Sequence, residues 1–146
     1  MTINGLRLKA ERDLLAPPGD VWALLAEPRH LSDWWPGYRV IRPDRRGLEP
    51  GARWEVVRSQ AGLLRRPGEE GLVTITEVEE NRRLAWHDVQ QRFAAAVDLE
   101  GDTGQTRARV TVEAPWWRIL VEGLRLVPQE ALSRLHALCQ TAAGLH

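Results

Sequence analysis

Four charged residues of the chain are predicted to point toward the apolar interior of a β-sheet, where a charge needs a partner or a ligand. They are Arg12, Arg58, Glu77 and Asp88, and each continues the apolar face of an alternating segment. A buried charge must be paired or lie where water or ligand reaches it. An ion pair of Arg12 or Arg58 with Asp88 or Glu77 would anchor a carboxylate or hydroxyl of a bound molecule.

The alternative for three of these residues is a solvent-exposed position at a strand end. The sequence favours it for Arg58, Glu77 and Asp88, since strand boundaries predicted from sequence shift by a few residues. Arg12 is the strongest of the four candidates, because Leu14 continues the same face beyond it. We therefore expect Arg12 inside the binding site.

No motif of a known catalytic centre stands out. The histidines, at positions 30, 87, 136 and 146, lack the spacing of a zinc helix, and the chain has no glycine-rich phosphate loop or nucleophile elbow. His87 and Asp88 are neighbours on one strand, so their side chains point to opposite faces. We assign no catalytic residue and expect no metal and no cofactor. Arg12, Asp88 and Tyr38 remain the candidates for donors and acid–base groups.

Aromatic side chains supply the second set of candidate site residues. The chain has seven tryptophans against one tyrosine and one phenylalanine, and an indole combines a large flat apolar surface with one N–H donor. Such side chains suit a planar or polycyclic ligand, but they also fill ordinary cores, which is the interpretation we favour for Trp22. The predicted ligand-binding residues are Trp34, Trp35, Trp54, Trp86, Phe93, Val110, Trp116, Trp117, Leu120, Leu124 and Arg12.

The elements that position these residues follow from periodicity and from prolines and glycines. Residues 6–14 alternate as a half-buried strand, and two short helices follow, the first with Asp20 as its expected cap. The last helix should cover residues 115–144, with a break near Val127 before Pro128. Six strands joined by short turns are predicted between them, at residues 38–42, 52–60, 71–79, 83–89, 92–100 and 106–113.

Length and composition indicate one soluble domain over residues 1–146. Twenty basic residues balance twenty acidic ones, which argues against a nucleic-acid partner. Cys139 is the single cysteine, so a disulfide framework is excluded and a buried apolar role is expected. The first residues lack the apolar core of a signal peptide, and no apolar window is long enough for a membrane span. We expect a cytoplasmic protein.

The order of elements resembles the helix-grip fold of the START-like and Bet v 1-like superfamily, often called SRPBCC. Short motifs bring it closer to the polyketide cyclase/dehydrase and lipid-transport branch. They are Ala16–Pro17, Val21–Trp22, Leu31 with Trp34 before Pro36–Gly37, the run Gly-Leu-Glu-Pro-Gly at 47–51, and the segment from Asn81 to Trp86. The resemblance implies an α+β fold in which a curved seven-stranded antiparallel sheet grips the C-terminal helix around a largely apolar cavity.

Three functions stay open, because the superfamily includes carriers, receptors, cyclases and chaperone activators. The favoured one is non-catalytic binding of a small hydrophobic molecule, such as a lipid or polyketide. The second is a metal-free aromatase/cyclase-like enzyme, which would need a coherent polar cluster inside the cavity. The third is an interaction module like the Hsp90 activators, with a collapsed interior.

The sequence leaves two further partners open, namely a membrane surface and a second copy of the chain. Antiparallel pairing places the loops at 61–70, 87–91 and 114–117 at one end of the sheet. We expect this end to admit ligand. The first loop contains Leu63-Leu64-Arg65-Arg66, whose leucines are favoured to pack over the sheet edge, and transient contact with a membrane is the alternative. A homodimer is also compatible with the sequence.

Overall fold

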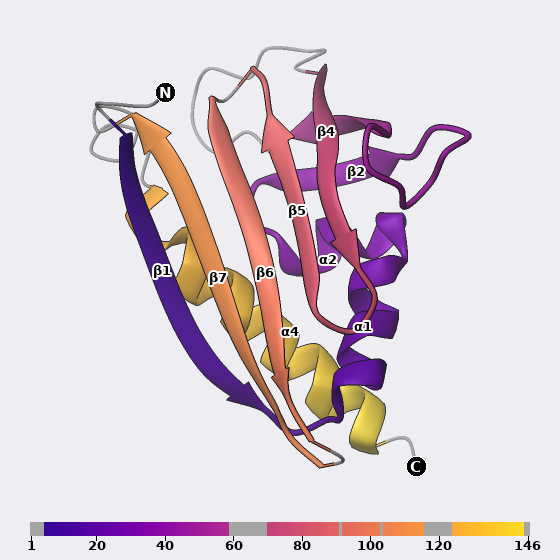
Figure 1. The fold of residues 1–146 in the computed structure, drawn as a ribbon, viewed down its shortest axis with the longest axis vertical. Helices are drawn as coiled ribbons and strands as arrows, with labels where there is room; N and C mark the ends of the chain where they lie inside the picture. Colours follow the sequence, from indigo (N-terminus) through magenta and orange to yellow (C-terminus); the bar gives the residue numbers. More distant parts are fainter. Residues whose placement is uncertain (1–4, 59–69, 91, 103, 116–123, 145–146) are drawn as a thin grey trace.

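The computed structural model describes residues 5–58, 70–90, 92–102, 104–115 and 124–144. Strands dominate the first four ranges and helix the last (Figure 1). In chain order the elements are β1 (Gly5–Leu14), α1 (Pro18–Ala26), the 3-10 turn η1 (Pro28–His30), α2 (Leu31–Trp34), β2 (Tyr38–Arg42), β3 (Arg53–Arg58), β4 (Glu70–Glu79), β5 (Arg83–Asp88), β6 (Phe93–Gly101), β7 (Thr106–Pro115), the 3-10 turn η2 (Leu124–Leu126) and α4 (Val127–Gly144).

The seven strands form one antiparallel sheet in the order β1-β7-β6-β5-β4-β3-β2. The first strand returns to pair with the last over its whole length, from Gly5 opposite Pro115 to Leu14 opposite Thr106. The sheet curves around α4, which crosses one face and packs chiefly against β1 and β7 (Figure 1). This arrangement confirms the predicted α+β helix-grip architecture, with two short helices after the first strand.

Prolines set the limits of the first helices. Pro18 opens α1, where its missing N–H costs nothing, and Pro28 opens η1. The expected cap is wrong: the N-cap position is Pro17, no side chain caps it, and Asp20 lies in the first turn. An acidic residue still stabilises a helix there through the helix dipole. The extended backbone of Trp35 and the positive φ of Gly37 (96°) then turn the chain into β2.

The C-terminal helix begins at Val127, the position of the predicted break, with Pro128 in its first turn. Its sheet-facing side buries Ala131, Leu132 and Leu135, and Cys139 is 3% exposed, as expected for a structural thiol. The first part of the predicted helix, residues 116–123, lies outside the described residues. None of the helices in the described part has the length and apolar content needed to cross a bilayer.

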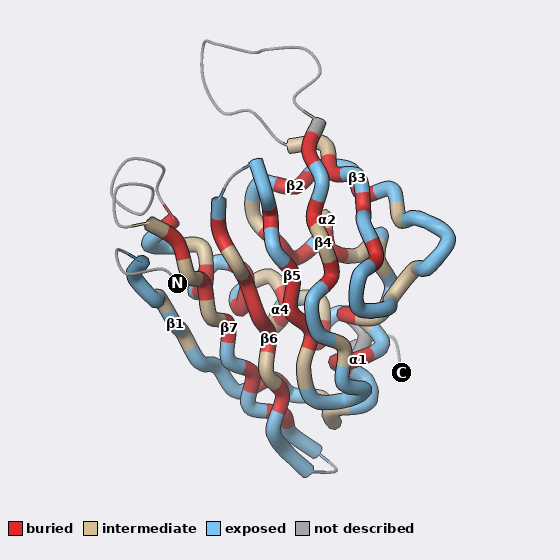
Figure 2. The backbone as a smooth tube through the Cα atoms, turned by 45° about the horizontal axis from the view of Figure 1, so that its top comes forward, coloured by how far each residue is buried: buried red, intermediate tan, exposed pale blue. Residues whose placement is uncertain are grey.

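The two faces of the sheet differ sharply in burial (Figure 2). Alternate residues on the face toward α4, which we call the inner face, form the core, whereas the outer face carries most of the strands' charges. A β-bulge between Ile75 and Glu77 interrupts the alternation in β4. Glu77 therefore pairs with Ala85 on the outer face and is exposed. The inward orientation that alternation gives Glu77 was wrong, because a bulge shifts the parity of every residue beyond it. The favoured solvent-exposed position of Glu77 was confirmed.

Candidate functional site

A buried chain of three polar side chains lies at one end of the inner face. The Tyr38 hydroxyl donates to Asp88 Oδ2 at 2.8 Å, and Arg58 Nη2 donates to Asp88 Oδ1 at 2.6 Å. The Asp88 side chain is fully buried, and that of Arg58 is 10% exposed. These residues come from β2, β5 and β3, so three strands meet in one cluster. The two acid–base candidates Asp88 and Tyr38 are brought together, with Arg58 as the cationic partner.

Strand parity explains how these side chains reach the interior. Arg58 follows Trp54 and Val56 on the inner side of β3, and Asp88 follows Leu84 and Trp86 on the inner side of β5. Each is the last residue of its strand. The prediction of an inward face was therefore confirmed for both residues. The favoured position in solvent was wrong, since both side chains are buried.

Gly71 makes room for the Arg58 guanidinium. A Cβ atom at position 71 would lie only 2.6 Å from Arg58 Nη2 and 2.8 Å from Cζ, closer than non-bonded atoms approach. Gly71 lies opposite Val56 on the neighbouring strand β4. The absence of a side chain at Gly71 therefore leaves space for the guanidinium where it contacts Asp88. Sequence reasoning missed this role, because a glycine in a strand indicates close approach without naming the group that approaches.

Burial determines the protonation state of Tyr38. Its pKa is raised well above 10.0, chiefly by desolvation, then by the negative charge of Asp88 and the hydrogen bond donated to it. The Trp86 indole and the Arg58 charge act in the opposite direction. Tyr38 is thus a neutral hydrogen-bond donor at physiological pH. The ion pair beside it is costly to bury, because desolvation of two charges can exceed their attraction.

Aromatic rings adjoin this cluster at Tyr38, and Trp35 contacts all of them. Its ring lies 4.8 Å from Trp86 and 5.9 Å from Trp34 in edge contacts, and it stacks on Phe93 at 5.9 Å with an interplanar angle of 19°. Tyr38 lies 6.3 Å away, and Trp34 also contacts Trp86 at 5.8 Å. We call Trp34, Trp35, Trp86 and Phe93 the ring cluster. Edge-to-face and offset contacts of this kind are favourable beyond the area they bury.

Three buried N–H groups at this site have no hydrogen-bond partner among the described residues. They are Trp34 Nε1, Trp86 Nε1 and Arg58 Nε. A fourth such nitrogen, Nδ1 of His30, lies on η1. An unsatisfied buried donor costs about 1–3 kcal/mol, so natural structures seldom leave several of them near one cluster. A bound molecule or ordered water with acceptor oxygens would remove this cost.

The other predicted ligand-binding residues take different positions. Trp54 is buried, but its Nε1 donates a hydrogen bond to the carbonyl oxygen of Gly47 at 2.7 Å. This bond stabilises the connection between β2 and β3. Val110 and Leu124 are part of the core. Trp116, Trp117 and Leu120 lie outside the described residues, and so does the predicted membrane-contact sequence at 63–66.

Arg12 is separate from the polar cluster. Its side chain is exposed at the edge strand β1, and Nη1 donates to Ser133 Oγ on α4 at 3.3 Å. The apolar face of β1 does continue to Leu14, which is fully buried. However, the sheet ends at β1, so its inner positions lie at the margin of the interior rather than in its middle. The expectation that Arg12 leads the inward charges was wrong.

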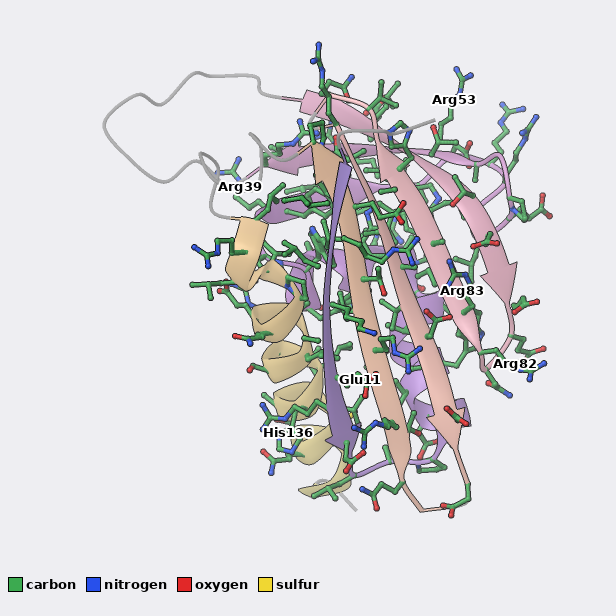
Figure 3. All side chains as sticks on the ribbon, turned by 60° about the vertical axis from the view of Figure 1, so that its left-hand side comes forward. Glu11, Arg39, Arg53, Arg82, Arg83 and His136 are labelled. Atoms are coloured by element: carbon green, nitrogen blue, oxygen red, sulfur yellow. The ribbon has the colours of Figure 1, made fainter. Side chains whose placement is uncertain are left out.

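The outer face holds two hollows formed by described residues. The larger, of about 890 Å³, has a floor of small residues that includes Ala85, Ala94 and Ala96. Its walls are charged side chains in ion pairs, such as Arg83 with Asp98 at 2.7 Å. Figure 3 shows Arg83 and Glu11 on this side, turned away from α4. The smaller hollow, of about 490 Å³, lies toward the start of β1 and the β5–β6 turn.

The described residues contain no group of three or more histidine, cysteine, aspartate or glutamate side chains placed to hold a metal ion. The polar cluster is the set of described side chains at the inner face that offers acid–base and hydrogen-bonding groups. Its charged pair is neutral overall, its tyrosine is protonated, and three of the buried N–H groups beside it have no partner among the described residues. Such an arrangement can orient a polar group of a hydrophobic molecule by hydrogen bonds.

Comparisons with known proteins agree with this architecture. Residues 6–140 match the family described as polyketide cyclase / dehydrase and lipid transport. A crystal structure of a protein from Nitrosomonas europaea superposes with a TM-score of 0.72 at 23% identity, covering 95% of this chain and 97% of that one.

Two further solved structures have the same fold. A solution structure of a protein from Arthrobacter aurescens gives a TM-score of 0.70 at 18% identity, covering 93% of this chain and 87% of its own. A Mycobacterium smegmatis protein gives 0.67 at 20% identity, with 94% and 92% covered. The comparison with curated proteins finds no match. At these identities the structural likeness establishes the fold alone.

Proposed function

Because the chain belongs to the polyketide cyclase / dehydrase and lipid transport family, we propose that it binds a small hydrophobic molecule between the inner face of its sheet and α4. The observation that carries this proposal is the Tyr38–Asp88–Arg58 chain buried against the ring cluster. A charged pair of this kind is a poor way to stabilise a core, since apolar residues of similar volume do so as well or better. Its position among large aromatic surfaces is typical of a site that orients a ligand.

The ring cluster supplies the apolar wall of the proposed site. Trp34, Trp35 and Trp86 are each at most 2% exposed, and their edges and faces contact one another in this structure. A ligand that reaches them must therefore replace ring–ring contacts with ring–ligand contacts of similar kind. Trp35 contacts the other three rings of the cluster, so its displacement would open the largest surface.

A matched pair of alanines tests whether an apolar molecule binds inside. Ala94 and Ala95 are neighbours on β6, and both border the larger outer hollow. Ala95 is 4% exposed and lies opposite Trp86 on the inner face, whereas Ala94 also borders the smaller outer hollow. Titration with the fluorescent probe N-phenyl-1-naphthylamine should give saturable binding at one site. Ala95→Leu should weaken the probe's binding about tenfold, since the added carbons occupy the site, and Ala94→Leu should leave it unchanged.

Two results would contradict the proposal. One is the absence of saturable probe binding by the folded protein. The other is weakening by Ala94→Leu with none by Ala95→Leu, which would place the apolar site on the outer face. Circular dichroism and thermal unfolding check that both variants are folded.

A second candidate function is a cyclase-like enzyme, and the polar cluster favours it. Such an enzyme needs hydrogen-bond donors that stabilise negative charge developing on a ketone oxygen. Arg58 has an unpartnered Nε–H, and its Nη2 is held in place by Asp88. Incubation with a short poly-β-ketone separates the two candidates. A carrier gives the same products as buffer alone. A cyclase accelerates ring closure to a product of the same mass after aldol addition, or lower by one water after dehydration.

A further inference from the structure

The two edges of the sheet are protected against strand pairing to different degrees. At one edge, β2 is five residues long, and its pairing with β3 is irregular between Tyr38 and Val40. At the other edge, β1 is ten residues long and pairs with β7 without a register shift. Short strands and bulges keep an edge from pairing with another chain, whereas a long regular edge is a template for a further strand.

The free edge of β1 is open in the part of the chain that the structure describes. There β1 pairs with β7 alone, and in Figure 3 it runs along the near side of the sheet. Leu8 and Ala10 point inward and pack against the core, whereas the alternate residues lie on the outer face. The side chains of the outer row are therefore available to a strand that pairs beside β1.

The outer charges of β1 are divided between its two halves. Arg7 and Lys9 lie in the first half, Glu11 and Asp13 lie in the second, and all four residues are exposed. Charges of a single sign would repel a second copy of the strand in every register. Opposite signs in the two halves make the strand complementary to itself when two copies run antiparallel.

One register satisfies these charges. When Ala10 lies opposite Ala10 of the other copy, Lys9 lies opposite Glu11. Arg7 lies opposite Asp13 in the same register, and the two-fold symmetry forms each pair twice. A slide by two residues in either direction places Lys9 opposite Lys9, or Glu11 opposite Glu11, of the other copy. A parallel pairing in register would place every charge beside its own copy, so the pattern favours the antiparallel arrangement.

We propose that two copies of the chain associate through their β1 strands, antiparallel about a two-fold axis at Ala10, so that the seven strands of each copy join in one continuous sheet. Both inner faces, each with its own α4, then lie on the same side of the joint sheet. This inference goes beyond the proposed function and depends on no ligand.

The ion pairs within each copy prepare the acidic half of β1 for this contact. Glu11 already accepts from Arg107 and Arg109 on β7, and Asp13 pairs with Arg107. Their carboxylates are thus held in place before the cations of the other copy approach, which lowers the entropy lost on pairing. Lys9 has no ion-pair partner among the described residues, so the contact with Glu11 of the other copy would provide one.

Light scattering after size-exclusion chromatography measures the association. We expect a mass twice that of the 16.6 kDa chain, with dissociation promoted by salt. Lys9→Glu puts a carboxylate opposite Glu11 and should raise the dimer dissociation constant at least about tenfold. Arg82→Glu changes the net charge equally between β4 and β5, away from β1, and should leave the constant unchanged. A monomer at millimolar concentration, or a dimer that Lys9→Glu does not weaken, would overturn the proposal.

A mixing experiment separates the interface from any damage to the fold. Glu11→Lys should also weaken self-association, because it puts a second cation opposite Lys9. An equal mixture of the Lys9→Glu and Glu11→Lys proteins should form a mixed dimer, since each substituted residue then meets the opposite charge in the proposed register. Two folded variants that do not associate with each other would contradict the pairing of Lys9 with Glu11.

Cysteine cross-linking tests the register itself, also in the case that Glu11→Lys does not fold. Residues directly opposite on antiparallel strands have Cα atoms about 4.5–5.5 Å apart, which a disulfide can span. Ala10→Cys should therefore give a covalent dimer on mild oxidation. Leu8→Cys lies on the same face, but its two copies are about 13 Å apart along the strands and should not cross-link. Cross-linking of Leu8→Cys alone, or of neither variant, would overturn the register.

The native thiol does not interfere with this measurement. Cys139 is 3% exposed and lies on α4, so the unaltered protein should stay free of disulfide under the same oxidation. A covalent dimer of the unaltered protein would contradict the assignment of the cross-link to β1.

Discussion

The two faces of the sheet carry charges under opposite conditions. On the outer face, Arg83 pairs with Asp98 at 2.7 Å and both side chains are 34% exposed. On the inner face, Arg58 pairs with Asp88 at 2.6 Å, and the two side chains are 10% and 0% exposed. The geometry is similar, but water screens only the outer pair. Two ion pairs of similar length therefore contribute differently to the free energy of unfolding.

The pKa shifts show the same contrast. Glu11 on the outer face has a lowered pKa because Arg109 and Arg107 donate hydrogen bonds to its carboxylate. Tyr38 on the inner face has a raised pKa, and there the main cause is burial. The pKa shift of Glu11 on the outer face is therefore caused chiefly by hydrogen bonds from its partners, and that of Tyr38 on the inner face chiefly by desolvation. A polar group that persists inside despite this cost is the better candidate for a function.

The largest expected difference between the faces is in the effect of removing one carboxylate. Asp88→Asn leaves the buried Arg58 charge without its counter-charge and should lower the free energy of unfolding by about 3 kcal/mol or more. Asp98→Asn makes the same chemical change to the exposed pair and should cost less than about 1 kcal/mol. Urea unfolding of both variants measures the two values. Equal losses of unfolding free energy in the two variants would show that the inner pair is as well solvated as the outer pair.

A smaller effect is expected from the titration of Tyr38. Its folded pKa is raised, so its contribution to stability is fully present below pH 10 and is lost as the pH rises through the folded value. Tyr38 is the only tyrosine, so near-ultraviolet phenolate absorbance reports on it alone. The phenolate should form well above pH 10 in the folded protein and near pH 10 in urea. Tyr38→Phe should flatten the loss of stability in this alkaline range. Titration near pH 10 in the folded state would contradict the buried hydrogen bond.

Much of the fold was predictable because local patterns and global structure agree. All seven strands lie within a few residues of their predicted ranges, since alternation and turn residues mark both strands and connections. The inward faces of Arg58 and Asp88 followed from the same alternation. Alternation predicts which face a residue lies on, but it does not predict whether a strand end is buried or exposed. Arg58 and Asp88 are both the last residues of their strands.

The errors have identifiable causes in the tertiary structure. The bulge that turns Glu77 outward could not be predicted from the sequence, because the residues before it alternate regularly. Arg12 follows the correct parity but lies on an edge strand, where an inner position is still exposed. The contact of Gly71 with the Arg58 side chain joins two strands that only the fold places side by side. The burial of Trp34, Trp86 and Arg58 near one another likewise depends on packing between α2, β3 and β5.

The central claim is that the inner face, and not the outer hollows, binds a small hydrophobic molecule. A crystal structure of the protein with N-phenyl-1-naphthylamine tests it most directly. We predict the ligand between the inner face and α4, against Trp35. A ligand seated over Ala94 on the outer face, with the ring cluster unchanged, would contradict the account.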